Sequence, residues 1–439
     1  MRRKRVFRIF ILFASVISSV LAMGTELINK ELNIVKSEKL CDAFWIIAIV
    51  LITFLIVEFL FSHHIYMGIK YFWHYTTIYY RLERQMIDAG FGIMRGNYIE
   101  LPKIKLTLSK GLSQGTLKIR NKLKFDTKFD NMAFTPALGK YIVERHYLSP
   151  DGNYYIYELL DGSCSFKLTF NSMEEFLSYN DTVPTYKLFL DARTHVKLQH
   201  TLVTGMTGSG KTYFLYGIIL QMLNKKVQYI LYFADPKGSS LAVLGSKIAP
   251  DKTAIKIDEI ITLLEKFVEE MNQRQAEIKT LLESKLDADY SDFGLCPYVF
   301  IFDEYASFVS VLNSQEKKIR DKVKSMLYQI ILMGRQSGFF FFAILQKSDA
   351  TIIDTAIRDN LPLKIVLGNA EQQTYVTTFG TGVAVPNRQY CIGEGVFTEP
   401  TLAPEPKFLQ CPYFNKFDIL DACVTSPGGV TTRAPEIKS

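Results

Sequence analysis

The sequence predicts an α/β protein in which a parallel sheet wound by helices is preceded by a membrane anchor and a small β-rich domain. Three observations lead to this prediction. After about residue 184, apolar runs of strand length alternate with helical patterns, as in a parallel sheet buried on both faces. Two long apolar runs precede residue 62. Between these runs and the α/β part, short alternating segments are separated by turn signals.

The two apolar runs are each close to the length that a bilayer requires. Residues 6–23 are interrupted only by Arg8, and residues 43–61 only by Glu58. Because basic residues precede the first run and follow the second, the positive-inside rule places both ends in the cytoplasm. We therefore expect residues 1–61 to anchor a multi-pass protein in the cell membrane, with two transmembrane helices at about 6–23 and 43–61.

The first apolar run has an alternative interpretation as a cleaved signal peptide. Residues 21–23 (LAM) loosely resemble a small-residue cleavage site. In either case the second run returns the chain to the cytoplasm, so the later residues are expected there. The sequence leaves open whether the first run is removed.

The rest of the chain changes in composition three times, which predicts four further parts. Aromatic and basic residues after position 61 suit the headgroup region, and the turn at 149–153 (SPDGN) predicts a hairpin in the β-rich part. The tail from 421 is rich in Pro and Gly. The predicted parts are a juxtamembrane helical segment (62–96), a small β-rich assembly domain (97–183), an α/β domain (184–420) whose activity is inferred below, and a disordered tail (421–439).

The α/β part contains five solid apolar runs and three long helical patterns. A helix whose apolar residues repeat at i, i+3 and i+4 buries one face, as the pattern ending near Gln336 does. The alternation of strand and helix predicts a doubly wound sheet. The predicted strands are 201–204, 229–234, 298–302, 339–345 and 363–367, and the predicted helices are 212–224, 260–282 and 318–336.

A glycine-rich loop follows the first of these strands and opens the first helix. Its sequence, GMTGSGKT, matches GxxxxGK[ST] at every specified position and has the strand–loop–helix context that the motif requires. Its glycines let backbone amides converge on a phosphate, Lys211 is placed to neutralise the β- and γ-phosphates, and the Thr212 hydroxyl should bind Mg²⁺. The predicted ATP-binding residues are Gly205, Met206, Thr207, Gly208, Ser209, Gly210, Lys211 and Thr212.

Two carboxylates follow the apolar strand at 298–302. We expect Asp303 to hold Mg²⁺ through its water shell and Glu304 to polarise the attacking water. An acidic pair after a strand can also be a solvated turn. The preceding phosphate-binding loop favours the catalytic interpretation, and with it the hydrolysis of ATP.

Two further residues could complete such a site. Gln346 ends the strand at 339–345, where a polar side chain could sense the γ-phosphate. Arg335 lies near the end of the last long helix, and its spacing alone does not distinguish a site residue from a surface arginine. The net charge of +7, from 51 basic and 44 acidic residues, does not by itself indicate nucleic-acid binding.

These motifs together resemble the FtsK/SpoIIIE branch of the HerA-like hexameric pumping ATPases, over roughly residues 184–395. Several motifs in the same order make this resemblance far more specific than the glycine-rich loop alone. Besides that loop and the acidic pair, the matching segments are HTLVTG at 200–205, DPKG at 235–238, EMNQR at 270–274, GRQSG at 334–338 and RDNLP at 358–362.

The resemblance implies a RecA-like ATPase that works as a homo-hexameric ring, using ATP and Mg²⁺. It gives Arg335 the role of an arginine finger acting on a neighbouring subunit and Gln346 that of a sensor. The sequence departs from the family pattern where Leu precedes Gln346 and Lys follows it. The N-terminal runs and the segment at 400–414 resemble coupling proteins of Gram-positive conjugative plasmids and integrative elements.

The main functional hypothesis is therefore a membrane-anchored, ATP-driven translocase that binds DNA without sequence preference and couples conjugative transfer. It implies a relaxase or mating-channel proteins as partners. Two alternatives are a protein-secretion motor of the same superfamily and a membrane scaffold that binds ATP without hydrolysing it. The sequence does not reveal the strandedness of the cargo, the direction of movement, the ring size or the role of the β-rich domain.

Overall fold

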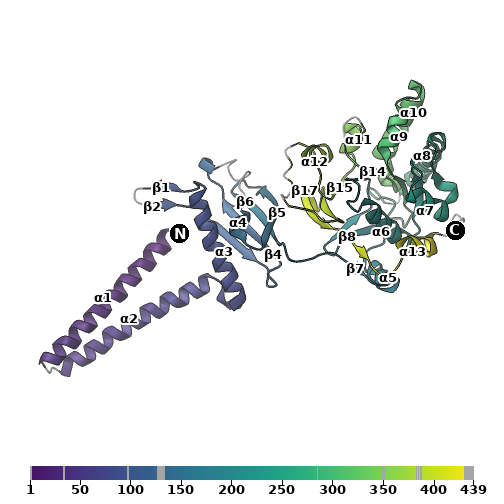
Figure 1. The fold of residues 1–439 in the computed structure, drawn as a ribbon. Helices are drawn as coiled ribbons and strands as arrows, with labels where there is room; N and C mark the ends of the chain where they lie inside the picture. The colour runs from purple at the N-terminus through teal and green to yellow at the C-terminus, as the bar shows by residue number, and fades with distance from the viewer. Residues whose placement is uncertain are drawn as a thin grey trace. The chain divides into compact units, whose positions relative to one another are not determined.

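The computed structural model describes residues 2–32, 35–95, 98–125, 134–283, 285–348, 352–381, 383, 385 and 388–429 (Figure 1). The chain forms two compact units, Met1–Cys164 and Ser165–Ser439. This division differs from the boundary at 184 that the sequence predicts. The reason is that Phe170, Phe176 and Val183 are buried in the same hydrophobic core as the first helix of the α/β part.

The first unit begins with two apolar helices, α1 (Arg2–Leu32) and α2 (Val35–Ser62), which run antiparallel. Within them, Arg8–Ile28 and Lys39–Ser62 are long and apolar enough to cross a membrane. Arg8 donates two hydrogen bonds to the Glu58 carboxylate, at 2.5 and 2.8 Å. The two charges that interrupt the apolar runs therefore neutralise each other, which lowers the cost of placing them near a bilayer.

Helix α3 and a four-stranded antiparallel sheet, in the order β3-β4-β6-β5, follow the two apolar helices α1 and α2. Helix α3 buries one face against this sheet, and the hairpin predicted at 149–153 joins β5 to β6. The elements are η1 (Ile65–Met67), α3 (Ile69–Asp88), β1 (Ile93–Arg95), β2 (Tyr98–Glu100), β3 (Ile104–Leu108), β4 (Gln114–Arg120), η2 (Leu123–Phe125), α4 (Thr135–Leu138), β5 (Tyr141–Leu148) and β6 (Tyr154–Asp161).

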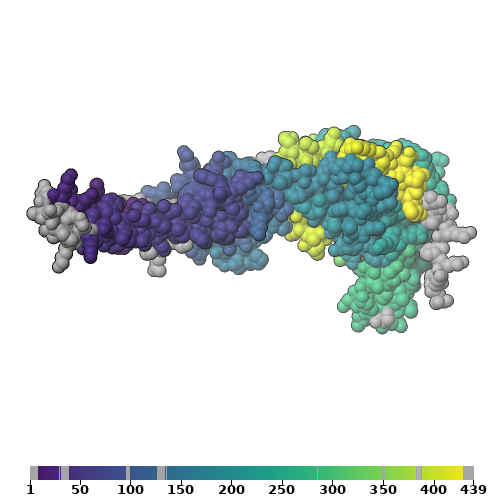
Figure 2. Space-filling view, turned by 90° about the horizontal axis from the view of Figure 1, so that it is seen from below, coloured from purple at the N-terminus to yellow at the C-terminus, as the bar shows by residue number. Residues whose placement is uncertain are grey.

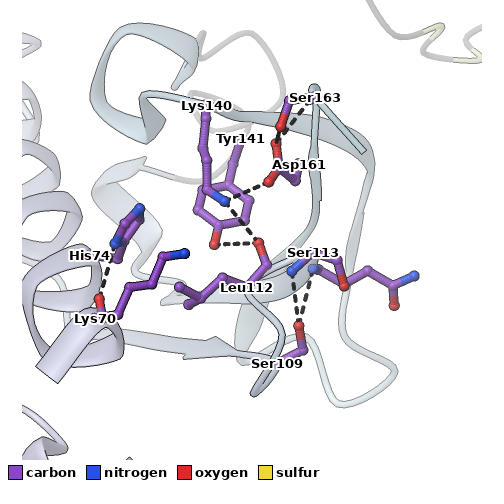
Figure 3. Close-up of polar contacts among 10 residues, drawn as sticks. Lys70, His74, Ser109, Leu112, Ser113, Lys140, Tyr141, Asp161 and Ser163 are labelled. Carbon is purple, nitrogen blue, oxygen red and sulfur yellow. Dashed lines mark hydrogen bonds and ion pairs between the residues drawn. The ribbon is translucent and has the colours of Figure 1, made fainter. Parts of the chain in front are cut away.

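One polar cluster ties the β3–β4 loop of this sheet to β5 and β6 (Figure 3). Leu112 has a left-handed backbone (φ 55°), and its carbonyl accepts hydrogen bonds from Lys140 Nζ at 3.2 Å and Tyr141 Oη at 2.9 Å. Lys140 also pairs with Asp161 at 2.5 Å. Burial alone would raise the pKa of Asp161, but the hydrogen bonds from Lys140 and Ser163 lower it to about 2. The cluster holds the loop against the sheet.

The second unit is built on an eight-stranded sheet in the order β12-β11-β13-β14-β10-β15-β16-β17. The strands from β12 to β15 are parallel. Its strands are β10 (Thr201–Gly205), β11 (Ile230–Ala234), β12 (Thr253–Ala254), β13 (Tyr298–Phe302), β14 (Phe339–Leu345), β15 (Leu363–Leu367), β16 (Glu394–Glu399) and β17 (Ala403–Gln410). Separate two-stranded sheets pair β7 (Thr169–Phe170) with β18 (Tyr413–Phe414) and β8 (Lys187–Asp191) with β9 (Thr194–Lys197).

Helices cover both faces of this sheet. Successive residues of a strand therefore pack in two different hydrophobic cores, one on each face. Val203 packs with α6, α7 and α13, whereas Leu202 packs with α8, α9 and α10. In the space-filling view the green surface of α9 and α10 stands out from the rest of this unit (Figure 2). The helices are α5 (Met173–Thr182), α6 (Lys211–Leu223), α7 (Ser240–Ile248), η3 (Pro250–Lys252), α8 (Ile257–Leu281), α9 (Tyr305–Leu312), α10 (Lys317–Ser337), α11 (Thr355–Asp359), α12 (Gln372–Phe379), α13 (Ile419–Thr425) and η4 (Pro427–Gly429).

The structure confirms the α/β class and corrects two details of the prediction. The sheet is mixed, because β16 pairs antiparallel with β15 and β17 pairs antiparallel with β16. A connection as short as that between Glu399 and Ala403 can only join antiparallel strands. Helix α13 also enters the segment predicted as a tail, and its Ile419 and Cys423 are buried against α6. Residues 430–439 of that tail lie outside the described residues.

Candidate nucleotide site and a distant arginine

The glycine-rich loop lies at the carboxyl end of the central strand β10, between β14 and β15. Gly208 and Gly210 both have positive φ, 81° and 96°, so the backbone turns in a way that an L side chain resists. A Cβ on Gly210 would lie 3.0 Å from the Gly393 nitrogen, and Gly393 N–H donates to the Ser209 carbonyl at 3.0 Å. The start of β16 therefore buttresses this loop.

Lys211 and Thr212 open helix α6 directly after this loop. The Lys211 ammonium donates to the carbonyl oxygens of Gly205 and Met206, so it lies over the loop. Burial lowers the pKa of Lys211, while the nearby carboxylates of Asp303 and Glu304 act in the opposite direction. Thr212 is exposed at the same end of the helix.

These features fit the phosphates of a nucleotide. The loop has the backbone turns and the helix N-terminus that bind phosphate oxygens, and Lys211 is a half-buried cation whose hydrogen-bond partners, among the described residues, are carbonyl groups. Exposed Met206, Thr207 and Gly208 leave the loop open to solvent. The Thr212 hydroxyl and the Asp303 carboxylate are oxygen ligands of the kind that Mg²⁺ prefers, so these two residues would fit as its ligands.

Asp303 follows β13 and is two strands away from the glycine-rich loop. Its backbone N–H donates to the Ala234 carbonyl at 2.9 Å, and its carboxylate accepts from the Glu304 N–H at 2.9 Å. Burial, and next to it the charge of Asp235, raise the pKa of Asp303 to about 6. A cation bound at this carboxylate would relieve that cost, as expected for a metal ligand.

Glu304 has an unusual backbone and a specific partner. It adopts the left-handed conformation (φ 47°, ψ 48°) at the start of α9, which is uncommon for a residue with a side chain. Its carboxylate lies 3.2 Å from the Lys237 ammonium. Lys237 follows β11, in the turn after Asp235, so the ends of the two neighbouring strands β11 and β13 both contribute charges to this edge.

Gln346 also lies at this edge. It follows β14, and the register pairs Thr204 of β10 with Leu345 of β14. Gln346 is therefore level with Gly205, in the gap between the loop and the acidic pair, and it is exposed. The structure thus brings together Lys211, Thr212, Asp303, Glu304 and Gln346 at the carboxyl ends of the parallel strands.

Arg335 is at the opposite edge of the sheet. It lies in the last turn of α10, immediately before β14 begins, whereas Gln346 follows the end of that strand. A strand of seven residues spans about 23 Å at ~3.3 Å per residue. Arg335 is exposed, and with Gln275 and Lys279 it lines a groove of about 700 Å³. It cannot reach the nucleotide loop of its own subunit.

A buried histidine separates Arg335 from the central strand. His200 precedes β10, and its Nδ1 accepts a hydrogen bond from the Phe341 N–H at 3.0 Å. Burial, and then the positive charge of Arg335, lower the pKa of His200 to about 3. His200 is therefore neutral, and the charge of Arg335 acts on it because both residues lie near the amino ends of β10 and β14.

Sequence reasoning assigned no role to three residues of this edge: Asp235, Lys237 and Gly393. Asp235 is almost fully buried and accepts hydrogen bonds from the backbone of Lys237 and Ser239, at 3.1 and 2.7 Å. The DPKG segment after a buried strand was a signal for the first two. Gly393 lies almost two hundred positions after the glycine-rich loop, so no local pattern could connect them.

Comparison with known proteins agrees with this geometry. Residues 183–330 match the sequence model of the FtsK/SpoIIIE family. The FtsK domain-containing protein YdcQ of Bacillus subtilis is 31% identical over 228 residues, which cover 51% of this chain and 46% of YdcQ. The DNA translocase FtsK of Staphylococcus aureus is 26% identical over 206 residues, 43% of this chain and 25% of that protein. The chain thus spans half or less of the length of these relatives.

Solved structures with a similar arrangement include two from transport systems. One is the pCW3 conjugation coupling protein TcpA in a monomer form with ATPγS, at 17% identity and a TM-score of 0.49, covering 79% of this chain and 98% of that one. Another is the cytoplasmic domain of the Thermomonospora curvata type VII secretion ATPase EccC, at 17% identity and a TM-score of 0.43, covering 57% and 32%.

Proposed function

Because this chain carries a P-loop ATPase domain of the FtsK/SpoIIIE family, we propose that it is a membrane-anchored motor that hydrolyses ATP to move DNA. The observation that carries the proposal is the gathering of Lys211, Thr212, Asp303, Glu304 and Gln346 at one edge of the sheet. A phosphate cradle alone would bind a nucleotide. The adjacent carboxylates and amide add the groups that hydrolysis needs.

Each residue has a task that its position supports. Lys211 donates to the Gly205 and Met206 carbonyls and would turn to the phosphate oxygens of a bound nucleotide, and Thr212 and Asp303 would hold Mg²⁺. Bound Mg²⁺ supplies positive charge that stabilises the developing charge of phosphoryl transfer. Glu304 orients and polarises the attacking water, and Gln346 donates to the terminal phosphate or to that water.

Arg335 supports a ring of subunits, which we propose to be a homo-hexamer. Since it lies at the edge opposite its own nucleotide loop, the site that it can serve belongs to a neighbouring subunit. An arginine supplied in this way stabilises transition-state charge only when the two subunits are correctly placed. Hydrolysis in one subunit would then depend on the position of the next, as a motor requires.

DNA is the proposed cargo, bound without sequence preference. A relative named DNA translocase FtsK is similar to this chain over 206 residues. Two apolar helices would place the motor at the inner face of the cell membrane. Because the sequence resembles conjugative coupling proteins, we propose that the chain delivers DNA to a transfer channel. Relaxase or channel proteins would be its partners.

The test uses the full chain reconstituted in lipid vesicles, with DNA on the side of the ATPase domain. ATP hydrolysis should be stimulated by DNA and should disappear in Lys211→Ala. Lys247→Ala, an exposed lysine of α7, is the matched control and should hydrolyse ATP normally. Hydrolysis that polypeptides stimulate and DNA does not would indicate a protein-secretion motor. ATP binding without any turnover would indicate a scaffold.

A further inference from the structure

Helix α3 of the first unit is apolar on two faces. Its inner face packs on the β-sheet through Tyr71, Tyr75, Ile78, Leu82 and Met86. On its outer face lie four large residues that nothing in the described chain covers. We call them the outer stripe: Ile69, Trp73, Tyr80 and Ile87, with exposed fractions of 71%, 63%, 47% and 44%.

The members of the outer stripe are aligned on one side of the helix. They are separated by four, seven and seven positions, and residues at these intervals lie on one side of an α-helix. Thr77 and Arg84 are exposed between them. Four large exposed residues aligned along five turns of a helix are not an ordinary solvated surface. It needs an apolar environment in the working protein.

The contacts of α3 with the end of α2 show where that environment lies. His63, at the end of the second apolar helix, has ring contacts with Phe72 at 6.3 Å, Tyr79 at 6.3 Å and Tyr80 at 5.9 Å. Residues 72–80 cover about 12 Å of helix, and both ends of this interval touch one histidine. Helix α3 therefore crosses the end of α2 and does not continue along its axis, as Figure 1 also shows.

Tyr80 connects the two observations, since it belongs to the outer stripe and stacks on His63. The stripe thus passes the end of the second candidate span at Tyr80 and extends along α3 to either side of that point. The exposed charges beside the stripe are mostly basic: Lys70, Arg81 and Arg84, against Asp88. An apolar strip flanked by basic residues suits the surface of a membrane with anionic headgroups.

We propose that α3 lies in the plane of the membrane surface, with its outer stripe inserted among the lipids and its basic residues at anionic headgroups. This inference rests on the proposed membrane anchoring. The helix acts as a second, lateral attachment that holds the β-rich part close to the bilayer, because the inner face of the same helix is part of that domain's core. A bilayer is favoured over a second copy of the chain as the occupant, since the stripe adjoins a candidate span.

Tryptophan fluorescence can test this proposal, because the chain contains two tryptophans, one in the apolar helix α2 and one in α3. Trp45 lies in α2 and Trp73 in the outer stripe. The full chain is reconstituted in vesicles of phosphatidylcholine and phosphatidylglycerol, in which bromine atoms on the acyl chains quench nearby tryptophan emission. Trp73→Phe leaves Trp45 to report on the anchor, and Trp45→Phe leaves Trp73 to report on α3.

A matched control places the only tryptophan on the other side of the β-sheet. Lys118 is exposed on β4 between Leu117 and Ile119, which face α3, so its side chain points away from α3. Lys118→Trp in a chain with both native tryptophans replaced by Phe should lose emission to aqueous iodide and not to brominated lipid.

The proposal expects Trp73 to lose more emission to bromines near the headgroups than to bromines near the chain ends, and to be protected from iodide. If Trp45 is quenched by brominated lipid while Trp73 behaves like the tryptophan at position 118, the anchoring stands and the proposal for α3 is overturned. If brominated lipid quenches neither native tryptophan, the membrane anchoring itself fails. Ile69→Lys should expose Trp73 to iodide without changing the quenching of Trp45.

Discussion

The two edges of the sheet in the ATPase unit differ in what they hold. The carboxyl edge holds a lysine, a threonine, two carboxylates and a glutamine, which follow β10, β13 and β14. Lys211 is held by the Gly205 carbonyl and Glu304 by the Lys237 ammonium. The amino edge holds Arg335, exposed beside an open groove, and the neutral His200. The residues predicted to bind nucleotide therefore lie together at one edge, whereas Arg335 lies at the opposite edge, away from them.

The strongest test of this difference is Arg335→Ala. Loss of an arginine finger lowers turnover by about 10³-fold or more, and nucleotide affinity should change little because the arginine is absent from its own site. Mixing Arg335→Ala with Lys211→Ala subunits should restore part of the hydrolysis, since each supplies what the other lacks. Steady-state ATPase assays of the mixed ring measure this.

Lys318→Ala is the control for the arginine, as an exposed residue at the other end of α10. It should leave turnover unchanged. If the two inactive variants do not complement each other in mixed assemblies, Arg335 does not act on the nucleotide site of a neighbouring subunit.

The next largest effect is expected for Glu304→Gln at the carboxyl edge. Removal of a general base or water-orienting carboxylate lowers turnover by about 10²- to 10⁴-fold. ATP binding, measured with a fluorescent analogue, should persist because Glu304 is not part of the phosphate cradle. Normal turnover in this variant would mean that Glu304 only pairs with Lys237.

A smaller effect is expected for Asp303→Asn, on the free energy of unfolding and on how that free energy changes with pH. The pKa of Asp303 rises from 3.8 to about 6 in the folded chain, so the folded state prefers the neutral carboxyl group. That preference stabilises the fold below the ordinary pKa and is lost as pH rises through about 6. Asp303→Asn should therefore raise the unfolding free energy of nucleotide-free protein at pH 8 by roughly 1 to 3 kcal/mol.

The gain in Asp303→Asn should shrink as the pH approaches 4, which thermal unfolding at several pH values would detect. Asp251→Asn, at an exposed position, should show no such trend. Hydrolysis should be lost in Asp303→Asn at every pH, because the amide is a poorer ligand for Mg²⁺.

The smallest effect is expected for Gln346→Ala. Loss of one hydrogen bond to a charged phosphate costs about 1.5 kcal/mol, which lowers turnover about tenfold. Single-turnover hydrolysis would separate this loss from any change in binding. An effect as large as that of Glu304→Gln would assign Gln346 a direct part in the chemistry.

Local patterns were sufficient for most elements of the ATPase core. Strands β13, β14 and β15 have the predicted bounds, because each is a solid apolar run buried on both faces and ends at a polar or breaking residue. The glycine-rich loop was identified by its spacing for a similar reason. Its chemistry depends on consecutive residues, and these can be recognised without knowing the rest of the fold.

The candidate site was only partly predictable in this way. Asp303, Glu304 and Gln346 were recognised as polar residues after buried strands, but their shared edge depends on the order β13-β14-β10. Lys237 and Gly393 escaped notice because their importance lies in contacts with Glu304 and Ser209, far away in the chain. The antiparallel strands β16 and β17 were missed since their runs are short and interrupted by Pro and Gly.

The sequence by itself determined the two apolar helices, the alternation of strands and helices, and the loop that marks a phosphate site, because each follows from residues close together in the chain. Only the tertiary structure decided that Arg335 lies at the edge opposite Lys211, that Arg8 and Glu58 neutralise each other, and that α3 leaves an apolar stripe uncovered. Those facts depend on contacts between segments that are far apart in the chain. Local sequence patterns do not specify such contacts, because they form only when helices and strands pack together.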